Sequence, residues 1–126
     1  MQGFMRFLGA QLQDAGEGSC VIALPARPEL SQQHGFVHAG AIGAIADTAA
    51  GYAALSLWPE GSDVLTVEYK LNLVAPATGQ TVVARAEVVR AGGSVTVCET
   101  RVFSVDGGEE TLCAIALVTL LRREGR

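Results

Sequence analysis

A long apolar stretch with one carboxylate in its middle constrains this fold more than any other feature of the sequence. Between Glu29 and Glu60 the only formal charge is Asp47. The residues around it are mostly Ala, Gly and Ile, and residues 58–61 carry a stop signal, so the sequence predicts a helix over residues 38–57. Because this helix offers no polar face, we expect it to be packed on nearly all sides. Its carboxylate must then pair, have a raised pKa or take part in chemistry.

Segments of strand character lie on both sides of this helix. They are residues 4–13, 18–25, 64–74, 81–90, 94–104 and 110–121. In 64–74 apolar and polar residues alternate, with Leu65, Val67 and Tyr69 among the apolar set, which predicts one buried and one wetter face. Six strands can cover one helix only if the sheet curls around it. We therefore predict an α+β fold with one central helix wrapped by a curved antiparallel sheet, in a single domain over residues 1–126.

The composition narrows the classes of partner and setting. The net charge is −4 and no basic stripe is visible, which argues against nucleic acid. The start of the chain has no apolar run of the secretory type, and a central Asp would cost about 2.5–3.5 kcal/mol in a membrane, so neither signal peptide nor membrane span is expected. Three cysteines without paired spacing fit a reduced, cytoplasmic setting. We expect Cys20, Cys98 and Cys113 to be small buried hydrophobes.

The start of the predicted helix is the second place where chemistry is expected. The free N–H groups of Ala39 and Gly40 can bind developing negative charge with the help of the helix dipole. His38 just before them can cap the helix or act in catalysis. His34 and His38 could share a metal only if residues 34–38 were helical, and the loop composition argues against that, so no metal is expected.

The spacing of these residues resembles that of a known family. Gln32, the run 38–40 (His-Ala-Gly) six residues on, and Asp47 nine residues after the histidine resemble the hotdog-fold acyl-CoA thioesterases, most closely the PaaI-like group of phenylacetic acid degradation. Residues 66–72 and 76–77 resemble that group's central strand and the following turn. Two positions differ from its pattern. An alanine stands where His-Gly-Gly has its first glycine, and a glutamine stands where an asparagine is common.

The resemblance implies a hotdog fold and a thioester hydrolase whose site lies between two subunits. Asp47 is then the general base or nucleophile, and the Ala39 N–H polarises the thioester carbonyl. His38 holds the helix start, while Gln32 and Thr66 orient water or thioester. Gln32 and Asp47 of one site come from different chains, in a dimer that is often paired into a tetramer. Coenzyme A enters as part of the substrate, and no other cofactor is implied.

The sequence also suggests the class of acyl group and the residues that contact the substrate. An aryl or medium-chain acyl group is the expected class. The residues expected to contact substrate are Gly40, Phe36, Val37 and Tyr52 near the acyl group, and Arg90 and Gly92 near the phosphates of coenzyme A. Two other functions fit the same fold: an acyl-CoA-binding module, which does not need Asp47, and a hydratase or dehydratase, in which His38 and Asp47 would act as a pair. A structural protein without a ligand is the remaining alternative.

Overall fold

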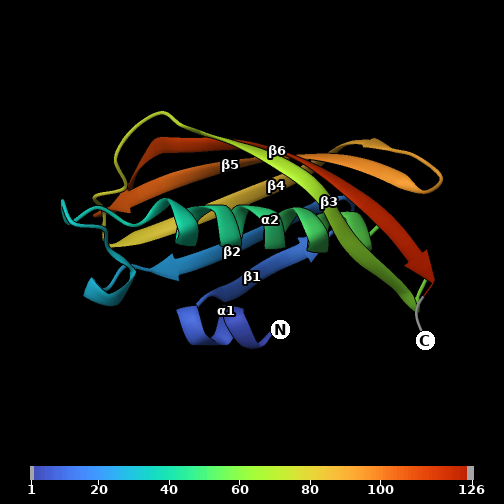
Figure 1. Ribbon diagram of the computed structural model, residues 1–126, viewed down its shortest axis with the longest axis horizontal. Coiled ribbons are helices and arrows are strands. Elements are labelled where there is room, and N and C mark those ends of the chain that lie inside the picture. Colours follow the sequence, from blue (N-terminus) through green and yellow to red (C-terminus); the bar gives the residue numbers. More distant parts are fainter. Residues whose placement is uncertain (1, 125–126) are drawn as a thin grey trace.

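One long helix, α2 (Ala39–Leu55), lies in the concave side of a six-stranded antiparallel sheet in the computed structural model, which describes residues 2–124 (Figure 1). The strand order is β1-β2-β4-β5-β6-β3. The strands are β1 (Gln11–Gly16), β2 (Ser19–Pro25), β3 (Ser62–Leu73), β4 (Thr81–Ala91), β5 (Val95–Asp106) and β6 (Glu109–Glu124). A short helix α1 (Gly3–Leu8) and a 3₁₀ turn η1 (Pro28–Leu30) complete the elements. The predicted fold class is confirmed.

Small residues let the sheet approach the backbone of α2 closely. The buried positions of the helix are mostly Ala, with Gly43, Gly51 and two isoleucines. Thr100 Oγ1 of β5 donates to the carbonyl of Ala46 at 2.9 Å, and Cys98 Sγ donates to the carbonyl of Ala50 at 3.5 Å. Side chains of this kind reach the helix backbone only because no large side chain lies between. All three cysteines are buried and free, and burial raises the pKa of Cys20 to about 12 and that of Cys98 to about 11.

The prediction of a strand over residues 4–13 was wrong in its first half. Residues 3–8 form α1, and β1 begins only at Gln11. Met5 and Leu8, three residues apart, are both buried against the core, which is a helical spacing. Gly9 then ends the helix with a φ of +83°, a conformation that favours glycine, and its N–H donates back to Arg6.

The predicted alternation of buried and exposed residues in β3 was also wrong. β3 is an edge strand, and Leu65 and Val67 are exposed. In the pairing with β6, Thr66 lies opposite Leu120 and Glu68 opposite Thr119, so Val67 is an extra residue in a β-bulge. The bulge reverses the alternation. As a result Thr66 and Tyr69, which strict alternation would place on opposite faces, both point toward α2.

Candidate active site

The loop before α2 is held in place by its own backbone hydrogen bonds. The Gln32 N–H donates to the carbonyl of Phe36 at 2.8 Å, and the Gly35 N–H donates to the carbonyl of Gln32 at 2.9 Å. Gly35 has a φ of +84°, which only glycine adopts readily. The His38 N–H donates to the carbonyl of Leu30 at 2.8 Å. The loop therefore leads the chain into α2 in one defined direction.

His38 caps α2 and leaves one backbone donor free. Its Nδ1 accepts from the Gly40 N–H at 2.8 Å, and its carbonyl accepts from Ala41 and Ile42. Gly40 was predicted as a free donor, and this is wrong, because its N–H already bonds the histidine. A Cβ at Gly40 would lie 3.0 Å from the same nitrogen. Within residues 2–124 the Ala39 N–H has no acceptor, so it is the donor that can receive a ligand at the positive end of the helix dipole.

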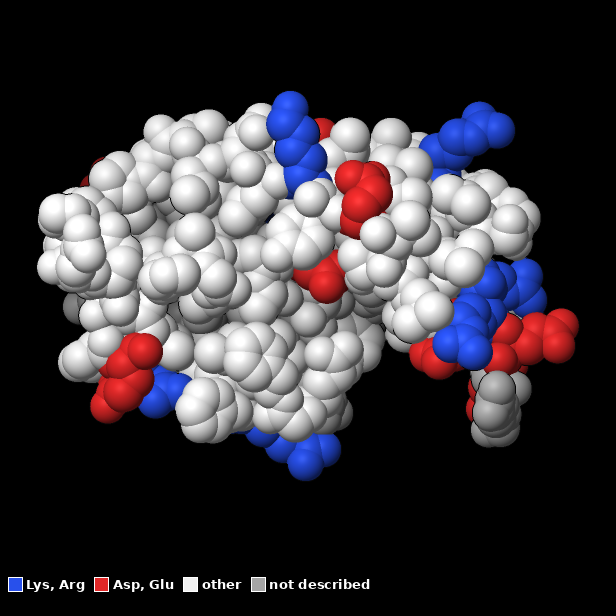
Figure 2. All heavy atoms as spheres, viewed as in Figure 1, with Lys and Arg blue, Asp and Glu red and all other residues white. Residues whose placement is uncertain are grey.

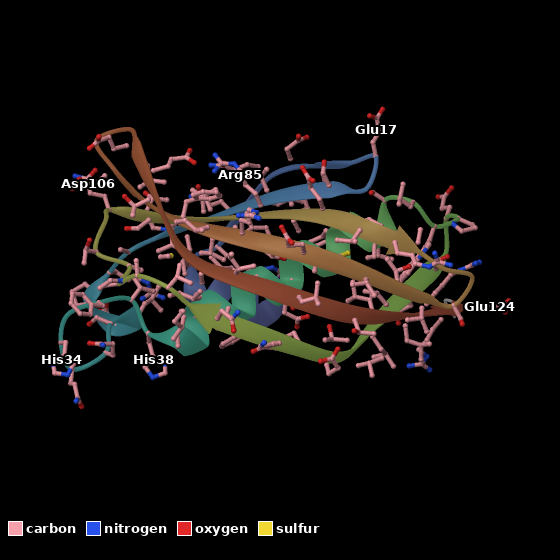
Figure 3. The ribbon with its side chains drawn as sticks, turned by 90° about the horizontal axis from the view of Figure 1, so that it is seen from above. Glu17, His34, His38, Arg85, Asp106 and Glu124 are labelled. Carbon is pink, nitrogen blue, oxygen red and sulfur yellow. The ribbon has the colours of Figure 1, made fainter. Side chains whose placement is uncertain are left out.

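His34 and His38 lie at one end of the molecule and both side chains extend outward (Figure 3). Residues 34–37 are not helical, so the two rings do not share a helix face. Among the described residues, no group of three or more His, Cys, Asp or Glu side chains could hold a metal ion. The helices within residues 2–124 are all too short or too polar to span a bilayer.

Asp47 lies half-buried in the middle of α2 and accepts a hydrogen bond from β3. Thr66 Oγ1 donates to Asp47 Oδ1 at 2.6 Å. Burial raises the pKa of Asp47 above the ordinary value for an aspartate, and the Thr66 hydrogen bond opposes part of that rise. In the described part of the chain Asp47 has no cationic partner within ion-pair distance. Much of the face on which α2 and β3 are visible is uncharged (Figure 2). The carboxylate is therefore not held in an ion pair, and a half-buried carboxylate of this kind can act as a base.

Most of the predicted site residues line one of two separate cavities. The first cavity, of about 520 Å³, is lined by Gln32, Phe36, Val37, His38, Ala39, Ile42 and residues 73–77. The second cavity, of about 310 Å³, is lined by Gln2, Asp47, Thr48, Gly51, Tyr52, Leu55 and residues 63–66. The structure thus brings together Gln32 with the Ala39 donor, and Asp47 with Thr66 and Tyr52. It does not bring the first group to the second.

Tyr69 of β3 packs on α2 at Gly43, between helix residues that line the two cavities. Ala39, Gly43 and Asp47 follow one another at intervals of four residues and so lie on one face of α2. A Cβ on Gly43 would be only 2.8 Å from Tyr69 Oη and 3.5 Å from its Cε1, so the ring packs directly on the helix backbone. Along the helix axis, Ala39 and Asp47 are about 12 Å apart. The sequence does not predict this contact, because it depends on the bulge that turns Tyr69 toward α2.

Arg90 and Gly92 line neither cavity, and their predicted contact with the phosphates of coenzyme A stays a prediction. Arg90 pairs with Val97, whose neighbours Thr96 and Cys98 are fully buried against α2, so Arg90 and Val97 project from the opposite, outer face of the sheet. The Gly92 N–H donates to the carbonyl of Val95 at 2.9 Å. The hairpin between β4 and β5 is therefore not part of either cavity.

Comparisons with known proteins agree with this fold. Residues 34–111 match the family described as "Thioesterase superfamily". A thioesterase family protein from Silicibacter pomeroyi has 40% sequence identity and a TM-score of 0.95, with 98% of this chain and 91% of that chain covered. A relative from Halobacterium salinarum, an esterase by name, is 33% identical over 81% of this chain and 70% of its own length. The E. coli PaaI protein of the phenylacetic acid degradation operon shares the fold, with a TM-score of 0.86 at 22% identity over 98% of this chain and 86% of that chain.

Proposed function

The chain belongs to the thioesterase superfamily and is a thioester hydrolase, and from this premise we propose that it hydrolyses acyl-CoA thioesters at a site shared by two copies of the chain. Asp47 of one copy and the Ala39 N–H of the other would act on the same thioester carbonyl. The observation that carries this proposal is the separation of the two groups within one chain.

One copy of the chain holds two halves of a site rather than one whole site. An oxyanion donor must lie about 2.7–3.1 Å from the developing oxyanion, and the attacking atom must approach the carbonyl carbon at about 3–3.5 Å. The Ala39 N–H and Asp47 lie in different cavities, and the Tyr69 ring occupies the helix face between them. A second copy whose α2 lies antiparallel beside the first would place its own Asp47 opposite Ala39.

The edge of the sheet supports such a pairing. β3 is twelve residues long and has a neighbour on one side only. Large apolar side chains are exposed along it and just beyond its end: Leu65, Val67, Tyr69, Leu73 and Val74. A long apolar edge strand is a template for another chain unless something covers it. We infer a homodimer in which β3 and α2 contribute to the interface.

The groups present are sufficient for hydrolysis. The Ala39 N–H polarises the carbonyl and stabilises the tetrahedral oxyanion. The partner's Asp47 takes a proton from water as the water oxygen bonds to the carbonyl carbon. When the oxyanion collapses, the C–S bond breaks and the proton passes to the coenzyme A thiolate. Thr66 holds the carboxylate, and Gln32 in the first cavity can orient the thioester.

Hydration of an enoyl-CoA is the alternative reaction for this site. That reaction needs a histidine that can exchange a proton with the substrate. In this chain the Gly40 N–H occupies His38 Nδ1 and orients the ring, and Nε2 is the nitrogen that would have to exchange the proton. An assay for hydration of crotonyl-CoA, run beside an assay for thioester hydrolysis, distinguishes the two reactions. We expect thioester hydrolysis and no hydration.

Mixing two inactive variants tests the shared site. Asp47→Asn and Ala39→Pro homodimers each lack one group at both sites. In a mixed dimer, one site receives Ala39 from one chain and Asp47 from the other, and it is intact. Random reassociation makes half of the dimers mixed, so we expect about a quarter of wild-type activity to return on unfolding and refolding the two together. Each variant refolded alone is the control. If the mixture stays inactive, the two groups do not act across the interface.

Thr66→Val should move the acid limb of the pH–activity profile to higher pH. Asp47 must be ionised to act as a base, so activity falls as pH drops through its pKa. The hydrogen bond from Thr66 lowers that pKa, and without it the pKa rises further. We would measure kcat/KM from acid to neutral pH, with Thr66→Ser as a matched control that keeps the hydroxyl. An acid limb that does not move in the valine variant would contradict this role.

A further inference from the structure

Tyr69 packs on α2 at the midpoint between the two groups assigned to catalysis, and the proposed mechanism does not use it. Its ring covers Gly43, which lies four residues from Ala39 and four from Asp47. On β3, Thr66 before it lines the second cavity and Leu73 after it lines the first. We call this ring the partition, because it lies on α2 and β3 between residues that line the first cavity and residues that line the second, although it lines neither cavity itself.

The proposed dimer places this partition between its two active sites. If Ala39 of one copy faces Asp47 of the other, antiparallel helices bring Gly43 of each copy to the same level, at the two-fold axis. Both Tyr69 rings then lie close to the axis. An acyl chain that runs along the helix face from either site toward the axis meets a ring there.

Resting on the proposed function, we propose that Tyr69 determines specificity by limiting the length of the acyl group. Packing alone holds the ring, because its hydroxyl has no hydrogen-bond partner within residues 2–124 and 44% of the residue is exposed in the single chain. The limit therefore comes from the volume of the ring and not from its hydroxyl. Short acyl groups fit before the ring, and longer ones collide with it.

The test compares acyl-CoAs with straight chains from butanoyl to dodecanoyl. For Tyr69→Ala we expect the ratio of kcat/KM for dodecanoyl-CoA to kcat/KM for butanoyl-CoA to rise by about tenfold or more. A single methylene group in a hydrophobic pocket already changes kcat/KM by about 10-fold or more. Tyr69→Phe keeps the ring and should keep the wild-type ratio. Lys70→Ala is the matched control: Lys70 pairs with the exposed Leu117, on the face of the sheet away from α2.

A second variant approaches the same contact from the helix. In Gly43→Ala the new methyl group would sit 2.8 Å from Tyr69 Oη, so the ring must swing aside. We expect the ratio of kcat/KM for dodecanoyl-CoA to kcat/KM for butanoyl-CoA to rise in this variant as well. If Tyr69→Ala does not fold, Gly43→Ala tests the role of the ring in its place. Circular dichroism and gel filtration verify fold and dimer. A folded, dimeric Tyr69→Ala with the wild-type ratio, or with no activity at all, would overturn the inference alone. Failure of the wild-type chain to hydrolyse any acyl-CoA would overturn the proposed function as well.

Discussion

Asp47→Asn should lower kcat for acyl-CoA hydrolysis by about 10³-fold or more, within the range expected when a general base or nucleophile is lost. The amide fits the same space but cannot accept a proton at neutral pH. Release of the coenzyme A thiol from a panel of aryl and straight-chain acyl-CoAs measures the effect. Asp63→Asn is a matched control, because Asp63 lines the same cavity but, within residues 2–124, accepts only from the Val64 N–H. A kcat within tenfold of the wild-type value would contradict the role of the carboxylate in the mechanism.

The same variant should be at least as stable as the wild type at neutral pH. Burial raises the pKa of Asp47, so the folded chain favours the protonated carboxyl more than the unfolded chain does. Above the raised pKa the folded state therefore bears the cost of a half-buried charge, and asparagine removes it. The difference in unfolding free energy should disappear as pH falls below the ordinary pKa of an aspartate. Thermal unfolding of both proteins at neutral and acid pH checks this and shows that lost activity is not lost structure.

Ala39→Pro should reduce kcat by about 10²–10³-fold, the loss typical of removing one oxyanion donor. Proline removes the one backbone N–H that we assign to the carbonyl. The fold should accept it, because Ala39 is the first residue of α2, where proline is favoured and where the N–H has no helical partner. The preceding residue, His38, already has the extended conformation that a following proline requires, with φ −64° and ψ 140°.

Two measurements separate the loss of this donor from loss of structure. The far-ultraviolet circular dichroism and melting temperature of Ala39→Pro should match those of the wild type. Ala39→Gly, which keeps the N–H, should retain activity. An active proline variant would show that another group stabilises the oxyanion.

The predictions that were confirmed concern parts of the structure that short-range patterns determine. The apolar run around Asp47 predicted α2, because a helix without a polar face must be enclosed. The predicted start at His38 and the observed start at Ala39 differ by one residue, and the histidine is the cap. The prediction of a strand over residues 4–13 was wrong at residues 4–8. A short apolar segment there fits a strand or a helix, and only the packing of Met5 and Leu8 decides between them.

Local sequence is enough to specify the helix, its lone carboxylate and the donor at its start, because periodicity and capping act over a few residues. How these groups meet depends on contacts between segments that are distant in the chain. The bulge at Val67 depends on the register between β3 and β6, which are joined by contacts far apart in the chain. That bulge brings Thr66 to Asp47 and Tyr69 to Gly43. A one-residue shift in register turns every following side chain to the other face of the strand, and the pattern of the strand alone does not reveal such a shift.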